Sequence, residues 1–312
     1  MESFILSAQA ILPIFLLMTL GYVLKRMHFA EKKVFDGINK LVFHICLPVL
    51  LFSNIYKSGS GEVFDLKLIV FMIVALLCVF VIGYFLVFLL TKENRRRGVM
   101  LQGFFRSNYA ILGIPLVTYV CGEGAGGLSS VMAAVVVPLF NALAVISLER
   151  FRSGNVNYKE ICKGIVTNPL ILGCIVGMVF FAFDITLPKV LEQTVNDIAK
   201  LATPLALIAL GANFAFSDIR GYGRELTAVV TARLVLVPLF GMTLAALLGF
   251  RGEAIACAMV VFGSPVAVSS FAMAQQMGGD EKLAAQVVVV SSALCLVTLF
   301  FWIFILHSLG LF

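Results

Sequence analysis

The chain has 312 residues, of which 61% are hydrophobic and 13% are charged. Its mean hydropathy of +1.05 exceeds what a water-soluble domain can cover with polar surface. Composition therefore excludes a soluble globular protein and predicts an integral membrane protein that lies in the lipid bilayer. The net charge of +6 is interpreted as a topology signal, and no nucleic-acid partner is expected.

A helix needs about 20 apolar residues to cross the roughly 30 Å hydrocarbon core of a bilayer. Ten stretches of about that length contain no Lys, Asp or Glu, so the sequence predicts an all-α polytopic protein with ten transmembrane helices. The ten stretches are residues 5–24, 41–56, 68–91, 98–122, 124–148, 164–183, 201–217, 226–250, 254–279 and 283–306.

Prolines predict where several of these helices are interrupted. The second and seventh stretches are the shortest and carry Pro48 and Pro204. Proline removes an amide donor and clashes with the preceding turn, so both positions are predicted helix breaks.

The motif Gly-x-Pro stands in the middle of two other stretches. Gly113 and Pro115 form it in the fourth stretch, and Gly263 and Pro265 form it in the ninth. Glycine tolerates most backbone angles and proline disfavours a continuous helix, so both helices are predicted to break near the middle of the membrane. Paired broken helices are typical of secondary transporters.

The distribution of Lys and Arg predicts the orientation. The loops that follow stretches 1, 3, 5, 7 and 9 hold 16 of them, whereas the opposite side holds five. Cytoplasmic loops retain positive charge, so both termini are expected outside, in a multi-pass protein of the cell inner (plasma) membrane.

Five stretches in each half force the second half to enter the membrane with the opposite orientation. The sequence therefore predicts a 5+5 inverted repeat. The first repeat is expected at residues 1–150, a short cytoplasmic linker at 151–162, and the second, inverted repeat at 163–312.

Polar residues gather near the predicted breaks and are the candidate substrate-binding residues: Arg106, Asn108, Ser264, Ser269 and Ser270. Half-helix ends inside a membrane present unpaired N–H and carbonyl groups, which attract a small polar or anionic ligand. The alternative is that these side chains only satisfy the freed backbone groups.

Two cations, Arg106 and Arg233, lie inside the predicted stretches. Because a cation in lipid is costly, each needs a reason to be there. For Arg106, the neighbouring Asn108 favours an anion-binding or gating role over a side chain that reaches the headgroups. For Arg233, a structural role is favoured.

The sequence leaves the driving force open. None of the ten stretches contains an Asp or Glu, and His44 is interpreted as an interfacial histidine. Uniport driven by the membrane potential and symport with H⁺ or Na⁺ both remain. No motif for a cofactor, a metal or ATP is present.

Other classes of function are weighed against a carrier. An enzyme is not expected, because the stretches offer no nucleophile with a base and no pair of acids. A channel is the main alternative, since broken helices also build filters, and a carrier for a non-anionic molecule is a further one. The inverted repeat favours a carrier.

Three segments resemble the auxin efflux carrier family. Residues 108–116 are similar to its fourth-helix signature, in which an asparagine precedes Gly-x-Pro-Leu by five residues. Residues 203–213 are similar to the seventh-helix pattern of bacterial members, and residues 263–280 resemble the ninth. The resemblance covers essentially the whole chain.

The resemblance implies the five-plus-five fold of sodium/proton antiporters and bile acid symporters, with helices 4 and 9 broken and crossing. It implies a substrate that is a small carboxylate, such as malate, malonate or an auxin-like acid. By the same resemblance Asn108 contacts the substrate, Pro115 and Pro265 set the crossover, and the protein is a homodimer. The acidic residue that plant members carry in their third helix has no counterpart here.

Overall fold

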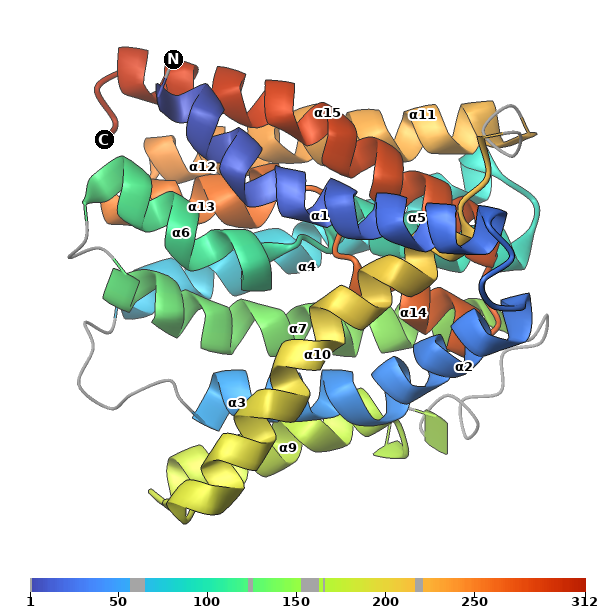
Figure 1. Cartoon of the computed structure of the whole chain (residues 1–312). Helices are drawn as coiled ribbons and strands as arrows, with labels where there is room; N and C mark the ends of the chain where they lie inside the picture. Colours follow the sequence, from blue (N-terminus) through green and yellow to red (C-terminus); the bar gives the residue numbers. More distant parts are fainter. Residues whose placement is uncertain (1, 57–64, 123–125, 153–162, 165, 217–220) are drawn as a thin grey trace.

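A computed structural model describes residues 2–56, 65–122, 126–152, 163–164, 166–216 and 221–312, and in this part of the chain the regular structure is helical (Figure 1). The principal segments are α1 (Glu2–Arg26), α2 (Lys32–Leu41), η1 (Val42–Cys46), α3 (Leu47–Tyr56), α4 (Leu66–Leu90), α5 (Asn94–Phe105), α6 (Tyr109–Cys121), α7 (Gly126–Arg152), α9 (Pro169–Ala182), α10 (Lys189–Asn213), α11 (Gly223–Thr231), η4 (Ala232–Leu236), α12 (Val237–Leu247), α13 (Glu253–Gly263), α14 (Ser269–Gln276) and α15 (Glu281–Ser308).

Within the described residues, six continuous segments are long and apolar enough to cross a membrane: 32–56, 66–90, 126–152, 189–213, 223–247 and 281–308. The prediction of an all-helical, membrane-spanning chain is confirmed. Of the linker expected at 151–162, only Phe151 and Arg152 are described, in the last turn of α7, and the rest lies outside the described residues.

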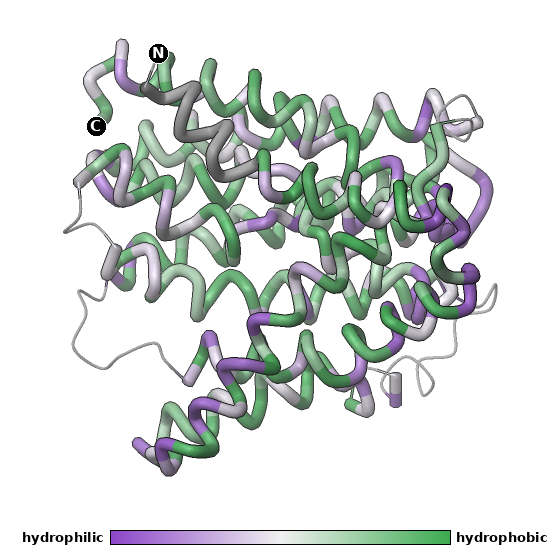
Figure 2. Tube along the Cα trace, viewed as in Figure 1, coloured by the Kyte–Doolittle hydropathy of each residue, from purple (hydrophilic) through white to green (hydrophobic). Residues whose placement is uncertain are grey.

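The predicted bounds were wrong for two helices that continue into polar sequence. The segment 32–56 begins nine residues before the predicted 41, and α10 begins twelve residues before the predicted 201. The added turns carry charges such as Lys33 and Asp197 on exposed faces, so they stay helical without being apolar. Figure 2 shows these hydrophilic ends in purple, beside the green apolar remainder.

The predicted breaks at Pro48 and Pro204 are also wrong. Helix α10 runs through Pro204 without interruption. Pro48 stands at the start of α3, directly after the π-helical turn η1, and Pro238 follows the π-helical turn η4 in the same way. A widened turn absorbs the missing amide bond, so the helix continues through the proline.

Glycines allow the closest helix pairs of the described chain. A Cβ on Gly21 of α1 would lie 2.0 Å from the carbonyl oxygen of Ile208 in α10, and a Cβ on Gly211 would lie 1.9 Å from that of Met18. In the same way α9 packs on α3, where a Cβ on Gly173 would lie 2.5 Å from the Pro48 oxygen. Only glycine permits such approaches.

The helices of the molecule form two packed groups. Helices α1 and α2 pack on α10, and α3 packs on α9 and α10. The helices from α4 to α7 and from α11 to α15 form the second group around the broken helices. In Figure 1 the yellow α10 runs obliquely across the front of the bundle.

A polar junction joins α5, α11 and α15 at one end of the bundle. The guanidinium of Arg96 lies 2.8 Å from Glu225, 2.9 Å from Glu93 and 3.5 Å from Asp280. It also lies over the ring of Tyr222, 4.7 Å from the centroid. The hydrogen bond to Glu225 raises the pKa of Arg96 above its ordinary value, so this cation stays charged.

Candidate functional site

Two helices are interrupted inside the bundle, and their interruptions touch. One chain segment ends α5 at Phe105 and starts α6 at Tyr109, and the other ends α13 at Gly263 and starts α14 at Ser269. The backbone N–H of Asn108 donates to the carbonyl oxygen of Pro265 at 2.9 Å. Ser107 and Val266 form an antiparallel bridge, so the two breaks lie against each other in extended conformation.

The position of the first break differs from the sequence prediction. The second break falls at Pro265 as expected, but Gly113 and Pro115 lie inside α6, and the chain breaks earlier, at residues 106–108. Gly113 instead makes room for the ring of Tyr109, because a Cβ there would lie 2.7 Å from its Cε1. The Tyr109 hydroxyl donates to the Ser129 carbonyl at 3.2 Å, which fixes the first turn of α6.

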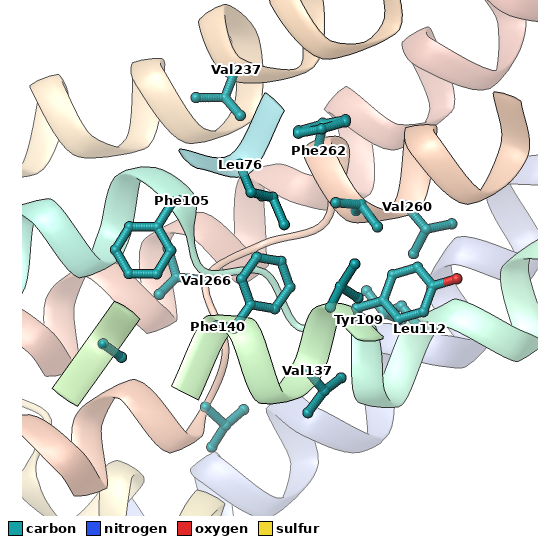
Figure 3. Packing of buried hydrophobic residues seen from close by; sticks show 14 of the residues in the cluster. Leu76, Phe105, Tyr109, Leu112, Val137, Phe140, Val237, Val260, Phe262 and Val266 are labelled. Atoms are coloured by element: carbon teal, nitrogen blue, oxygen red, sulfur yellow. The ribbon is translucent and has the colours of Figure 1, made fainter. Parts of the chain in front are cut away.

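Apolar side chains surround the touching breaks and keep lipid away from them. Phe105 and Phe140 stack with ring centroids 6.5 Å apart, and both are buried. Figure 3 shows these two rings beside Val266, with Tyr109 and Leu112 of α6 nearby. Irregular backbone inside a membrane is tolerated only where protein or water satisfies it.

Arg233 satisfies the carbonyl ends of two half-helices. Its Nε donates to the Ser264 carbonyl at 2.8 Å and its Nη2 to the Val261 carbonyl at 2.7 Å, at the end of α13. Its Nη1 donates to the Phe105 carbonyl at 3.1 Å, at the end of α5. The side chain is fully buried. A cation there neutralises the partial negative charge of both helix ends, so the structure favours the structural role.

Arg106 lies in the first break and has different partners. Its Nη2 donates to Asn141 Oδ1 at 2.6 Å and to Ser269 Oγ at 2.8 Å, and its Nη1 contacts the sulfur of Met273. The side chain is buried at 3% exposure. All three partners are neutral, and no described Asp or Glu pairs with it. Its charge is therefore hydrogen-bonded but not balanced.

Arg106 also lies at the positive ends of helices. Ser269, its partner, is the first residue of α14, and Asn108, two residues away, is the N-cap of α6. The amino end of a helix carries about half a positive charge. Three sources of positive potential thus meet at one place.

A small cavity of about 50 Å³ opens at this place, between the breaks, α3 and α7. Arg106, Ser107, Asn108 and Ser269 line it together with Asn141. At the about 10–15 Å³ that a water needs by this measure, the cavity holds a few waters or one small polar group. Helix α3 lines the cavity with Leu47, Leu50, Leu51 and one polar residue, Asn54.

Buried polar atoms without a partner among the described residues mark the breaks. They include Asn108 Nδ2 and Ser107 Oγ, which belong to residues that line the cavity. Buried donors are normally hydrogen-bonded, so unpaired ones next to a cavity indicate that a ligand or water completes them. Ser264 Oγ and Ser270 Oγ are unpaired as well, but neither residue lines the cavity.

The structure therefore brings together Arg106, Asn108 and Ser269 of the five candidate residues and leaves Ser264 and Ser270 outside the cavity. Sequence reasoning missed Asn141, which was detectable as a lone amide in the apolar stretch 124–148. His44 lies away from this site, exposed, with Nδ1 2.9 Å from the Lys40 carbonyl oxygen.

These features define a multi-pass, all-helical membrane protein with two broken helices that cross. The sequence model of a family described as "Membrane transport protein" matches the chain over two segments, residues 6–161 and 153–303. The chain belongs to this family, the auxin efflux carrier family, as its motifs predicted. The family consists of transporters, so the chain is not an enzyme.

Individual relatives match over nearly their whole length. A protein of Rhizobium meliloti (strain 1021) named "Putative malonate transporter" is 26% identical over 96% of this chain and 95% of its own. An uncharacterized transporter of Methanothermobacter thermautotrophicus is 24% identical over 95% of this chain and 97% of its own. An uncharacterized transporter of Methanocaldococcus jannaschii is 24% identical over 96% of this chain and 98% of its own.

Proposed function

We propose that this membrane transporter is a secondary carrier for a small organic anion, a carboxylate such as malonate or malate. The observation that carries the proposal is the unbalanced charge of Arg106. Its guanidinium is buried beside a cavity with neutral partners only. A carboxylate in that cavity would balance the charge and accept a charge-assisted hydrogen bond from a guanidinium N–H that Asn141 and Ser269 leave free.

The size and lining of the cavity favour a small substrate. A space of about 50 Å³ suits a carboxylate group better than an aromatic ring system. Asn108 Nδ2 and Ser107 Oγ supply unpaired donors for the second oxygen. The name of the Rhizobium meliloti relative points to malonate, which has this chemistry.

The packing supports ten crossings arranged as an inverted repeat. The six continuous segments, α1, α9 and the broken pairs α5/α6 and α13/α14 together supply ten. An exchange of the two halves maps the pair α1 and α10 onto the pair α9 and α3, and both pairs pack closely through glycines. The proposal includes the repeats at 1–150 and 163–312 and both termini outside the plasma membrane, and this helix arrangement and the positive loops support it.

Transport would proceed by movement of the group around the broken helices against the group of α1, α2, α3, α9 and α10. Gln275 of α14 contacts both groups: its Oε1 accepts from Asn39 of α2, and its Nε2 donates to Asp36 at 3.0 Å and to Glu281 at 2.8 Å. These bonds between α14 and α2 would break when the two groups of helices move apart at this end of the bundle. The predicted homodimer stays a prediction, since Gly173 and Gly177 already lie against α3.

Counterflow in proteoliposomes tests the function. Vesicles loaded with unlabelled malonate should accumulate labelled malonate transiently, and malate should compete while an amine of similar size should not. A carrier gives saturable counterflow, whereas a channel gives none. Absence of counterflow for each small carboxylate, with protein shown to be folded and inserted, would overturn the proposal.

A further inference from the structure

A second, larger cavity lies between α1, α15 and the end of α10, and it shares no lining residue with the cavity at the crossing. It measures about 560 Å³ and is lined by apolar side chains. Phe15, Met18 and Tyr22 of α1 form one wall, and Val290 and Leu294 of α15 form another. Leu294 is 48% exposed, so this groove opens on the outer surface of the bundle.

One end of the groove is basic. A neighbouring cavity of about 450 Å³ shares Tyr22 and Phe214 with the groove and is lined by Lys25, Arg26 and His28. The Arg26 guanidinium donates to the Tyr22 hydroxyl at 3.3 Å. Within the described residues neither Lys25 nor Arg26 forms an ion pair, and the nearby Glu281 is paired with Lys32 at 3.4 Å. The mouth thus carries uncompensated positive charge.

The depth of the groove matches one leaflet of a bilayer. Phe15 and Arg26 stand eleven residues apart on α1, which at 1.5 Å per residue is about 16 Å. Half of the roughly 30 Å hydrocarbon core is about 15 Å. An apolar slot of leaflet depth with cations at the headgroup level is complementary to a lipid with a negative headgroup.

We propose that this groove binds one anionic phospholipid, with an acyl chain along α1 and α15 and the phosphate at Lys25, Arg26 and His28. The charge argues against a second copy of this chain as the occupant, because two basic mouths would face each other. A free small anion would use the mouth alone and would leave the apolar slot empty. The groove and the crossing are separate sites, so this proposal does not depend on the carboxylate.

The test is lipid binding to purified, detergent-solubilised protein, measured by native mass spectrometry. The probes are phosphatidylglycerol and phosphatidylcholine with identical chains. Wild type should bind the former more tightly. At about 1 kcal/mol for each basic group, the double variant Lys25→Gln/Arg26→Gln should lose about 30-fold in affinity for phosphatidylglycerol and little for phosphatidylcholine.

A second variant tests the slot without a change of charge. Ala293 is exposed and lines the groove, so Ala293→Phe should fill it and weaken binding of both lipids. Lys200→Gln is the control, because that side chain is 79% exposed and lies elsewhere on α10. Equal affinity for the two lipids in wild type, or phosphatidylglycerol binding that both variants leave unchanged, would overturn the proposal. Complete competition by inorganic phosphate would also overturn it.

Discussion

Arg106 and Arg233 are two buried cations on the same crossing, and they differ in what surrounds them. Arg233 donates to main-chain carbonyls at the ends of α5 and α13. Arg106 donates to the neutral side chains of Asn141 and Ser269, at the start of α14. One guanidinium meets the negative ends of the broken helices, and the other adds to their positive ends.

This difference in surroundings indicates that Arg233 has a structural function and that Arg106 has a binding function. At Arg233 the protein itself supplies the compensating partial charges, so nothing further is required. At Arg106 the protein supplies hydrogen bonds but no negative charge, and a small cavity lies beside it. An anion is the missing partner. Four sets of substitutions test this contrast, and they follow in order of decreasing expected effect.

Loss of Arg233 should prevent folding. Arg233→Met would leave the Val261, Ser264 and Phe105 carbonyls without their buried donor, and each buried acceptor left unsatisfied costs about 1–3 kcal/mol. We expect little monodisperse protein on size-exclusion chromatography. Arg233→Lys, which keeps the charge, should restore part of the yield. A stable, active Arg233→Met protein would contradict the structural role.

Loss of Arg106 should instead weaken substrate binding strongly in a folded protein. Arg106→Gln keeps a donor toward Asn141 and Ser269 but removes the charge that faces the cavity. Truncation of one partner of a buried charge pair costs about 2–5 kcal/mol, so the KM for malonate in counterflow should rise at least about 30-fold. Arg106→Lys keeps the positive charge but lacks the planar guanidinium. Its KM for malonate should lie between those of wild type and Arg106→Gln.

Asn108→Ala should have a moderate effect. The backbone bond to Pro265 survives the substitution, so the crossing itself is retained. Only the unpaired Nδ2 beside the cavity is removed. A lost hydrogen bond to a charged ligand costs about 1.5–3 kcal/mol, which predicts at least about a tenfold rise in KM. An unchanged KM would remove Asn108 from the site.

A matched pair of serines gives the smallest and most specific contrast. Ser269 Oγ accepts from Arg106 and lines the cavity, whereas Ser270 Oγ is buried without a described partner and lies outside it. Ser269→Ala should raise the KM severalfold. Ser270→Ala should change neither transport nor the melting temperature appreciably, because it removes an unsatisfied group. The reverse result would place the binding site on the other face of α14.

The sequence predicted much of the architecture because lipid imposes strict rules. Apolar length predicted an all-helical, multi-pass membrane protein, and Pro265 lies in the second break, between α13 and α14. Prolines predicted the others poorly: Pro204 and Pro115 lie inside helices, and Pro48 follows a π-helical turn. In these helices packing and local widening absorb the missing amide bond, which a pattern of single residues does not reveal.

Part of the candidate site was predictable, because polar residues stand out in sequence that lies in lipid. Arg106, Asn108 and Ser269 were visible as polar residues in apolar stretches, and the structure brings them to one cavity. Ser264 was also singled out, but its carbonyl faces Arg233. Asn141 comes from α7, and only the three-dimensional packing brings it to Arg106. Local composition does not predict which residues distant in sequence form hydrogen bonds with each other.

The proposed function requires that the unbalanced charge of Arg106 binds a carboxylate. The most direct measurement is isothermal titration of malonate into purified wild type and into Arg106→Gln, in the same detergent and with matched melting temperatures. Malonate should bind wild type saturably at one site, from which malate displaces it, and the variant should lose at least about 30-fold in affinity. Binding to Arg106→Gln with the wild-type Kd would contradict the proposed function.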